Sequence, residues 1–130
     1  GEEFMLVLAA ESFTDPEQFC ESLRQRIGSK AFEHSTNQRS HVSASIGYAL
    51  FPALADRSDA NDWNLSLELA DAGLYLIKSG GRNGWAIVQA RARAGAAAFS
   101  GGVTGRLDQL EREGLIQIDT GPRRRVGDPH

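Results

Sequence analysis

The longest periodic pattern of apolar residues in the chain predicts an α-helix that ends near Ser79. Apolar side chains recur there at intervals of three and four residues, which is typical of one buried helical stripe. Asn61 or Asp62 can accept backbone amide hydrogens at the start, and Gly80-Gly81 supplies the left-handed residue that ends such a helix. The predicted stripe consists of Trp63, Leu67, Ala70, Leu74 and Ile77, and it is widened by Leu65, Leu69, Ala72 and Leu76.

Shorter patterns predict a second helix and several strands. The apolar run 4–8 has no polar alternation, which predicts a strand buried on both faces. Asp15 and Pro16 open a helix that Gly28 ends. We expect its Arg24 and Arg26 to face water, and the alternative is that either of them meets an anionic ligand.

Strands are also expected after this helix. Residues 31–34 predict a short strand, followed by a polar turn at 35–38. Apolar and small residues alternate from 42 to 50, which predicts another strand, in which Gly47 marks a bulge or a close backbone contact. Residues 85–88 are expected to form the last core strand.

The composition changes after this strand. Residues 89–102 are rich in alanine and predict a linker or an irregular helix. A small helix capped at Thr104 and a short strand at 115–118 are expected to follow. We therefore divide the chain into a main part, residues 1–89, and a C-terminal extension, residues 90–130, that is an appendage and not a second domain.

Composition and charge narrow the class of protein. The chain has 130 residues, of which 41% are hydrophobic, enough for one core. A net charge of −3 argues against a nucleic-acid partner. Cys20 is the single cysteine, which excludes an internal disulfide, and we interpret it as a core residue and not as a nucleophile. No apolar run can span a bilayer and no signal peptide is visible, so we expect a cytoplasmic domain.

Charged residues at two places in the sequence are candidates for a catalytic or ligand-binding role. Lys78 lies in the last turn of the main helix and Arg82 follows its glycines. These cations either complement the helix dipole or converge on a phosphate group. Glu2 and Glu3 precede the apolar run, either as solubilising turn charges or as functional carboxylates.

Three segments together resemble the GGDEF family of bacterial diguanylate cyclases. They are Gly1-Glu2-Glu3-Phe4 before an apolar run, Ser45-Ile46-Gly47-Tyr48-Ala49, and Ala70 to Lys78 with Gly81-Arg82-Asn83. Their order and approximate spacing match the family over residues 1–89. The resemblance implies an α+β fold, with a palm-like, ferredoxin-like sheet of the nucleotide-cyclase type and packed helices.

The same resemblance implies an enzyme and its site. A diguanylate cyclase condenses two GTP into cyclic di-GMP, a bacterial second messenger in signal transduction, and releases pyrophosphate. By position, Glu2 and Glu3 bind Mg²⁺ (or Mn²⁺) and help to activate the attacking hydroxyl. Gly1 leaves room for the nucleotide, and Lys78 and Arg82 contact its phosphates. Two subunits face each other, each with one GTP, so the resemblance implies a catalytic homodimer.

The chain differs from the family pattern at some positions, and these differences lead to further expectations. The chain starts inside the signature, so we expect the N-terminal part of the domain, with a metal-binding aspartate and guanine contacts, to lie in a longer parent protein. An N-terminal sensor domain is expected there, and a membrane anchor is compatible with it. The fragment alone is expected to be inactive and to expose bare sheet edges. Ser22 stands where the family usually has an inhibitory arginine, which argues against product inhibition.

Three classes of function remain open on the sequence. The first is an active cyclase. The second is a degenerate regulatory module that binds GTP or cyclic di-GMP without turnover, and the third is a structural dimerisation piece. Glu2 and Glu3 are both acidic, which favours the first class.

Overall fold

The computed structural model describes residues 3–9, 15–35, 38–54, 60–92 and 94–122. Its elements, in chain order, are α1 (Pro16–Gly28), β1 (Ala31–Ser35), β2 (Gln38–His41), β3 (Ser45–Tyr48), α2 (Ala60–Ser79), β4 (Gly84–Ala90), the short 3₁₀ helix η2 (Ala96–Phe99), α3 (Leu107–Arg112) and β5 (Ile116–Gly121). This mixture of helices and strands confirms the predicted α+β class.

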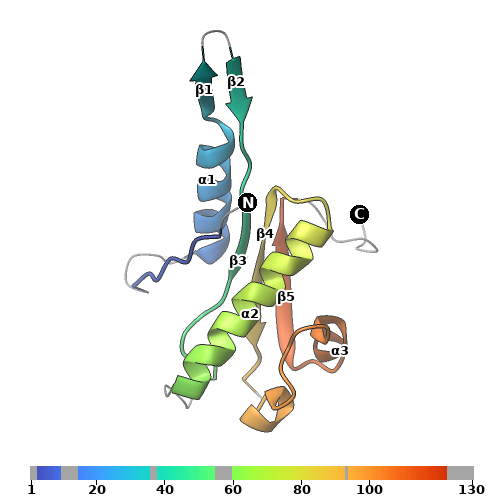
Figure 1. Cartoon of the computed structure of the whole chain (residues 1–130). Coiled ribbons are helices and arrows are strands. Elements are labelled where there is room, and N and C mark those ends of the chain that lie inside the picture. The colour runs from blue at the N-terminus through green and yellow to red at the C-terminus, as the bar shows by residue number, and fades with distance from the viewer. Residues whose placement is uncertain (1–2, 10–14, 36–37, 55–59, 93, 123–130) are drawn as a thin grey trace.

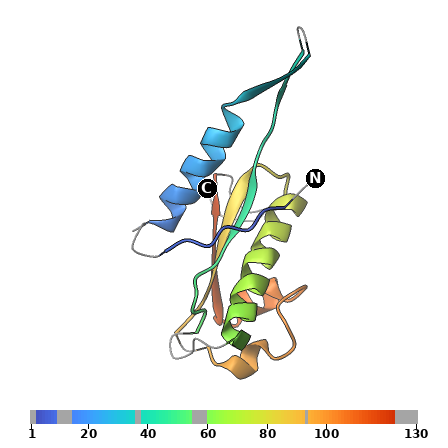
Figure 2. The same cartoon turned by 60° about the vertical axis from the view of Figure 1, so that its left-hand side comes forward.

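A three-stranded sheet in the order β3-β4-β5 forms the centre of the molecule (Figure 1). β3 runs parallel to β4, and β5 runs antiparallel to it, with Val88 opposite Ile118. α1 and α2 lie on opposite sides of this sheet (Figure 2). Because side chains alternate along a strand, Val88 packs with the α2 side, whereas Trp85 and Ile87 pack with α1.

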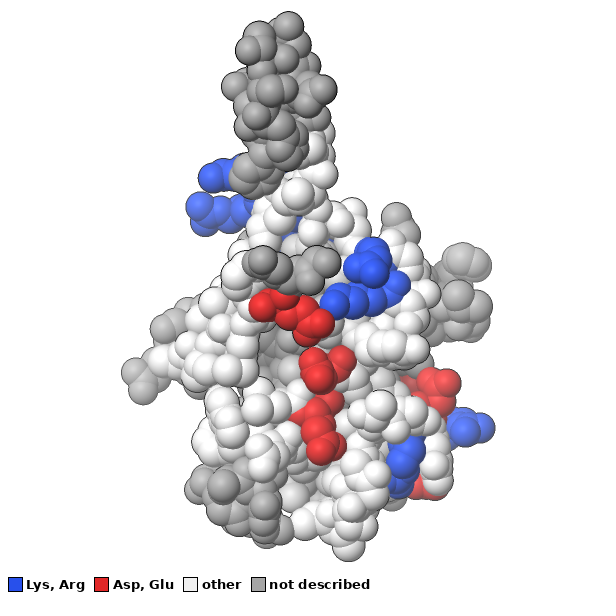
Figure 3. All heavy atoms as spheres, viewed as in Figure 1, with Lys and Arg blue, Asp and Glu red and all other residues white. Residues whose placement is uncertain are grey.

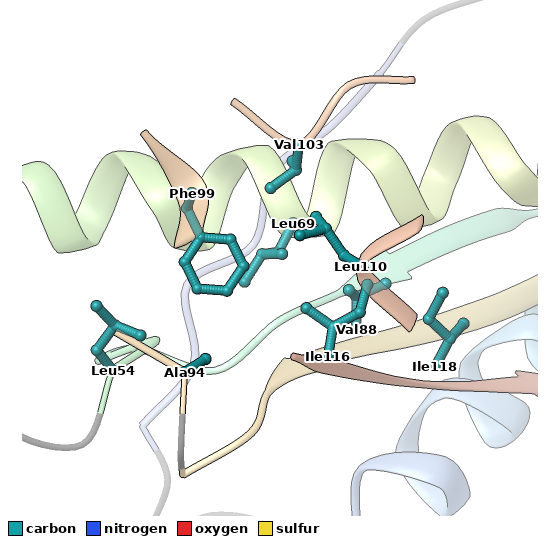
Figure 4. Packing of buried hydrophobic residues seen from close by; sticks show 9 residues of the cluster. All are labelled: Leu54, Leu69, Val88, Ala94, Phe99, Val103, Leu110, Ile116 and Ile118. Carbon is teal, nitrogen blue, oxygen red and sulfur yellow. The ribbon is translucent and has the colours of Figure 1, made fainter. Parts of the chain in front are cut away.

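The larger hydrophobic cluster lies between α2, the sheet and the C-terminal segment (Figure 4). Its nine buried residues are Leu54, Leu69, Val88, Ala94, Phe99, Val103, Leu110, Ile116 and Ile118. Six of these nine follow residue 90 in the sequence. The strand predicted at 115–118 is therefore β5, which joins the central sheet, so the prediction that 85–88 form the last core strand is wrong.

A smaller cluster lies on the other face of the sheet. Cys20, Trp85 and Ile87 are buried there, with Phe19 and Tyr48 packed against them. Cys20 has no exposed surface, which confirms its prediction as a core residue. Burial also raises the pKa of its thiol to about 12.

Two sequence predictions about local backbone structure are confirmed. Asp15 caps α1, because its carboxylate accepts hydrogen bonds from the backbone N–H groups of Glu17 and Gln18 at 3.0 and 3.2 Å. Gly47 marks a close approach of β3 to α2, since a Cβ there would lie 2.6 Å from the backbone nitrogen of Leu74 and would also meet the carbonyl oxygen of Ala70.

The predicted start and buried face of the main helix need correction. α2 already begins at Ala60, and Asp62, in its first turn, is buried. The Asp62 carboxylate accepts hydrogen bonds from the backbone N–H groups of Ala53 and Leu54, so it fixes the preceding loop. Leu67, predicted to be buried, is 37% exposed, whereas Leu69 is 1% exposed. The larger cluster covers the side of α2 that carries Leu69, which confirms the wider part of the predicted stripe.

The predicted strand at 4–8 is wrong. These residues have no regular secondary structure, and their exposed fractions range from 40% at Leu8 to 86% at Phe4. An apolar run is buried as a strand only when neighbouring strands cover it, and no strand within the described residues pairs with this run.

The region after α1 differs from the expected turn. β1 is confirmed, but Gln38–His41 form a strand, β2, that pairs antiparallel with it. Among the described residues, no helix is long and apolar enough to cross a bilayer.

Candidate functional site

The exit of α2 forms a tight turn with an unusual backbone. Three backbone hydrogen bonds close the helix end. The N–H of Gly80 donates to the oxygens of Leu76 and Ile77 at 3.0 and 3.2 Å, and the N–H of Arg82 donates to the oxygen of Ile77 at 2.8 Å. Gly81 has a φ of 118°, as expected for the glycine-rich exit.

The next two residues of this turn also have positive φ, of 65° at Arg82 and 55° at Asn83. Asparagine tolerates this region, but arginine rarely adopts it. Strained backbone of this kind is often found at functional sites. Arg82 therefore adopts a backbone conformation that the intrinsic preferences of arginine do not explain.

Lys78 and Glu3 contact each other although 75 residues separate them in the sequence. The Lys78 Nζ lies 3.2 Å from the Glu3 Oε2, and the two side chains are 31% and 63% exposed. Figure 3 shows acidic and basic side chains next to each other near the middle of the face that Figure 1 presents to the viewer. Because exposed ion pairs contribute at most about 1 kcal/mol, this contact adds little to stability.

The structure therefore brings together two of the site residues predicted from sequence, Glu3 and Lys78. Arg82 is exposed on the turn that follows Lys78. Gly1 and Glu2 lie outside the described residues, so their predicted places in the site stay predictions.

This site can supply some, but not all, of the ligands of a magnesium ion. Mg²⁺ is commonly held by one or two carboxylates together with substrate phosphates. Glu3 offers one exposed carboxylate beside an ammonium group that suits a phosphate. The described residues hold no cluster of three or more side chains that could ligate a metal on their own. Glu3 thus fits a metal ion that is shared with a bound nucleotide.

A polar network behind the same turn was not predicted from the sequence. The Arg24 Nη1 donates a hydrogen bond to the Asn83 Oδ1 at 2.9 Å. Its Nε and Nη2 donate to the two carboxylate oxygens of Glu21 at 2.9 and 2.6 Å. The Trp85 Nε1 donates to Glu21 as well, at 3.0 Å. We call Glu21, Arg24, Asn83 and Trp85 the Arg24 network.

The prediction that Arg24 faces water is wrong, because its side chain is only 16% exposed and makes three hydrogen bonds in this network. The spacing of Glu21 and Arg24, three residues apart on a helix, could have indicated their ion pair. Nothing in the sequence indicated that Arg24 reaches Asn83, 59 residues away. An open hollow of about 540 Å³ lies beside these two residues, bordered by the end of α1 and by residues 41–43.

Comparison with known proteins adds a family match. The model of the diguanylate cyclase GGDEF domain matches residues 1–84 of the chain. The bifunctional diguanylate cyclase/cyclic di-GMP phosphodiesterase MucR of Pseudomonas aeruginosa is 33% identical over 96 residues. This alignment covers 74% of the chain and 13% of MucR, so the chain spans only a small part of that relative. No solved structure matches the chain.

Proposed function

The chain belongs to the GGDEF domain family of diguanylate cyclases, and from this premise we propose that the protein condenses two GTP into cyclic di-GMP and two pyrophosphate. The observation that supports this activity most directly is the contact between Glu3 and Lys78. It joins a carboxylate of the family's signature segment to the helix end that carries the cations, as a phosphoryl-transfer site requires.

Each charged residue has a role in the proposed reaction. Lys78 and Arg82 bind the triphosphate and stabilise the charge that develops on the departing pyrophosphate. Gly1 leaves space for the nucleotide. Glu2 and Glu3 hold the divalent metal ion, Mg²⁺ or Mn²⁺, which neutralises charge on the phosphate oxygens when it is bound.

The bond changes need two bound nucleotides. The 3′-hydroxyl of one GTP attacks the α-phosphorus of the other, and the bond from that phosphorus to the oxygen of the departing pyrophosphate breaks. The same exchange in the opposite direction closes the ring, so two phosphodiester bonds form and two pyrophosphates leave. Glu3 assists by accepting the hydroxyl proton. Two copies of the chain, each with one GTP, would bring the two nucleotides face to face.

A structural role explains these residues less well. The ion pair of Glu3 and Lys78 is too exposed to stabilise the fold appreciably. Arg82 stands in a left-handed conformation that costs free energy, which a purely structural turn could avoid with glycine. Both features are understandable if the two cations act on a ligand.

The test is to change Glu3→Gln in the full-length protein and measure cyclic di-GMP formed from GTP and Mg²⁺ by chromatography. Loss of a carboxylate with this role should lower turnover by about 100-fold or more. The melting temperature should stay close to that of the wild type, because Glu3 is exposed.

The matched control is Glu17→Gln, an equally conservative change of an exposed glutamate in the first turn of α1. It should leave turnover unchanged. Undiminished product formation by Glu3→Gln would remove Glu3 from the mechanism. A wild-type protein that binds GTP without forming product would instead point to the regulatory module.

A further inference from the structure

We propose that Arg24 is a positioning residue for the triphosphate site, because its hydrogen bond to Asn83 holds the turn that presents Arg82. This inference rests on the proposed function and deepens it, since it assigns a role to a side chain on α1 that does not itself contact the nucleotide. The reasoning starts from how Asn83 is held.

Asn83 is fixed from two directions. Its backbone N–H donates a hydrogen bond to the Ser45 Oγ at 3.2 Å, which ties it to the start of β3. Its side-chain Oδ1 accepts a hydrogen bond from the Arg24 Nη1 at 2.9 Å, which ties it to α1. Since Asn83 directly follows Arg82, these two contacts also limit the backbone of Arg82.

Arg24 is itself held rigidly. Glu21 accepts two of its N–H groups in a bidentate pair, the strongest geometry for an arginine and a carboxylate. Glu21 in turn accepts hydrogen bonds from the Trp85 Nε1 at 3.0 Å and from the Gln25 Nε2 at 2.8 Å. Trp85 is 7% exposed in the smaller core cluster, so the network is anchored in the core.

This rigidity matters at a turn that is locally unfavourable. Arg82 and Asn83 both have positive φ, and for arginine the left-handed region is disfavoured. Without the contact to Arg24, the turn can relax toward other backbone conformations, and these present the side chain of Arg82 in a different direction. A binding group that is displaced by about 1 Å loses much of its effect.

The experiment measures the affinity of the full-length protein for a non-hydrolysable GTP analogue by calorimetry, with guanosine as a second ligand that lacks phosphates. Asn83→Gly removes the Oδ1 acceptor but keeps a residue that tolerates positive φ. Asn83→Asp keeps the acceptor and also tolerates positive φ. Arg24→Ala removes the donor, and Arg26→Ala is the matched control, because Arg26 is exposed on the same helix.

We expect Asn83→Gly and Arg24→Ala each to weaken binding of the analogue by about tenfold, as for loss of a well-placed phosphate contact. The double variant should bind no more weakly than the weaker single variant, because both changes remove the same contact. Asn83→Asp and Arg26→Ala should bind like the wild type. Guanosine should bind all variants alike, which a merely structural effect would not produce.

The outcomes separate this inference from the proposed function. Wild-type affinity for the analogue in both Asn83→Gly and Arg24→Ala would overturn the role of Arg24 and leave the proposed function standing. A wild-type protein that does not bind the analogue would overturn the proposed function together with this inference. If Arg24→Ala fails to fold, Asn83→Gly still decides, because it keeps the pair of Arg24 and Glu21.

Discussion

Glu21 is the residue on which most of the side-chain hydrogen bonds of the Arg24 network converge. Hydrogen bonds from Arg24 lower the pKa of this carboxyl to about 2, and bonds from Trp85 and Gln25 act in the same direction, against a partial burial that raises it. The hydrogen bonds to Glu21 also raise the pKa of Arg24. The pair therefore stays ionised at neutral pH.

This environment predicts a pH-dependent contribution to stability. The pKa of Glu21 in the folded protein lies below its ordinary value of 4.5, so the unfolded chain takes up the proton first as the pH falls. The stabilising contribution is full above pH 4.5 and is lost as the pH falls toward 2. The difference in unfolding free energy between wild type and Glu21→Gln should have its full value at pH 7 and be clearly smaller at pH 3.

Urea denaturation at both pH values measures this difference. Glu17→Gln serves again as the control, because Glu17 is exposed and its removal should change neither value. An equal difference between wild type and Glu21→Gln at the two pH values would contradict the assignment of the low pKa to Glu21.

At the scale of single residues, the sequence correctly predicted the roles of residues whose partners lie close along the chain. Asp15 caps the helix that follows it directly, and Cys20 lies on the apolar side of that helix. The resemblance to a known family indicated Glu3 and Lys78 as residues of one site, but not their contact with each other. The contact of Arg24 with Asn83 was missed because it depends on how α1 sits against the sheet, which no local pattern encodes.

Among the elements, the contact of α2 with β3 is the closest backbone approach that positions the site. Gly47 permits it, since the atoms that a Cβ would meet there are the carbonyl oxygen of Ala70 and the nitrogen of Leu74. Both belong to the helix backbone, so no side-chain rotation can relieve the clash. The position of α2, and with it that of Lys78, depends on this glycine.

Gly47→Ala should therefore destabilise the protein by about 1–3 kcal/mol, the usual cost of overpacking. Turnover should fall as well, because displacement of α2 moves Lys78. Gly28→Ala is the control: no atom lies within 4 Å of a Cβ at that position, and alanine there should be neutral or stabilising by up to about 1 kcal/mol. Chemical denaturation of both variants measures the effect, and wild-type stability of Gly47→Ala would refute the role of the close contact.

Elements with strong end signals were predicted well, and those that depend on distant partners were not. Gly28 and Gly80-Gly81 mark where α1 and α2 end, because these end signals lie in the sequence of each helix itself and need no distant partner. Which part of the wide predicted stripe of α2 is most deeply buried, at Leu69 and not at Leu67, is set by residues of the C-terminal segment. The run 4–8 was expected as a strand, but strand formation needs a paired neighbour that composition alone does not supply.

Across the whole molecule, the C-terminal segment and the part that matches the family share one core. β5 pairs with β4 from Ile116 opposite Ala90 to Gly121 opposite Trp85. Leu110 of α3 lies in the same cluster as Leu69 of α2 (Figure 4). The division into residues 1–89 and 90–130 stays a prediction. The shared core implies that a core substitution in one part also lowers the stability of the other part.

Leu110→Ala tests this coupling. Leu110 has no exposed surface, so its truncation should leave a cavity and lower the unfolding free energy by about 2–5 kcal/mol. The fluorescence of Trp63 in α2 and Trp85 in β4 reports on elements outside the C-terminal segment. Because a shared core unfolds cooperatively, we expect the tryptophan transition to shift to lower denaturant together with the loss of secondary structure.

Leu67→Ala is the matched control, since it removes the same atoms from a leucine that is 37% exposed on α2 itself. Although Leu67 is closer in sequence to both tryptophans, we expect its truncation to shift their transition much less, because a partly exposed side chain leaves no cavity. A tryptophan transition that Leu110→Ala leaves unchanged would mean that the C-terminal segment folds independently. A shift larger than that of Leu67→Ala would show that burial in the shared core, and not proximity in the chain, determines how strongly the segment supports the helix that carries Lys78.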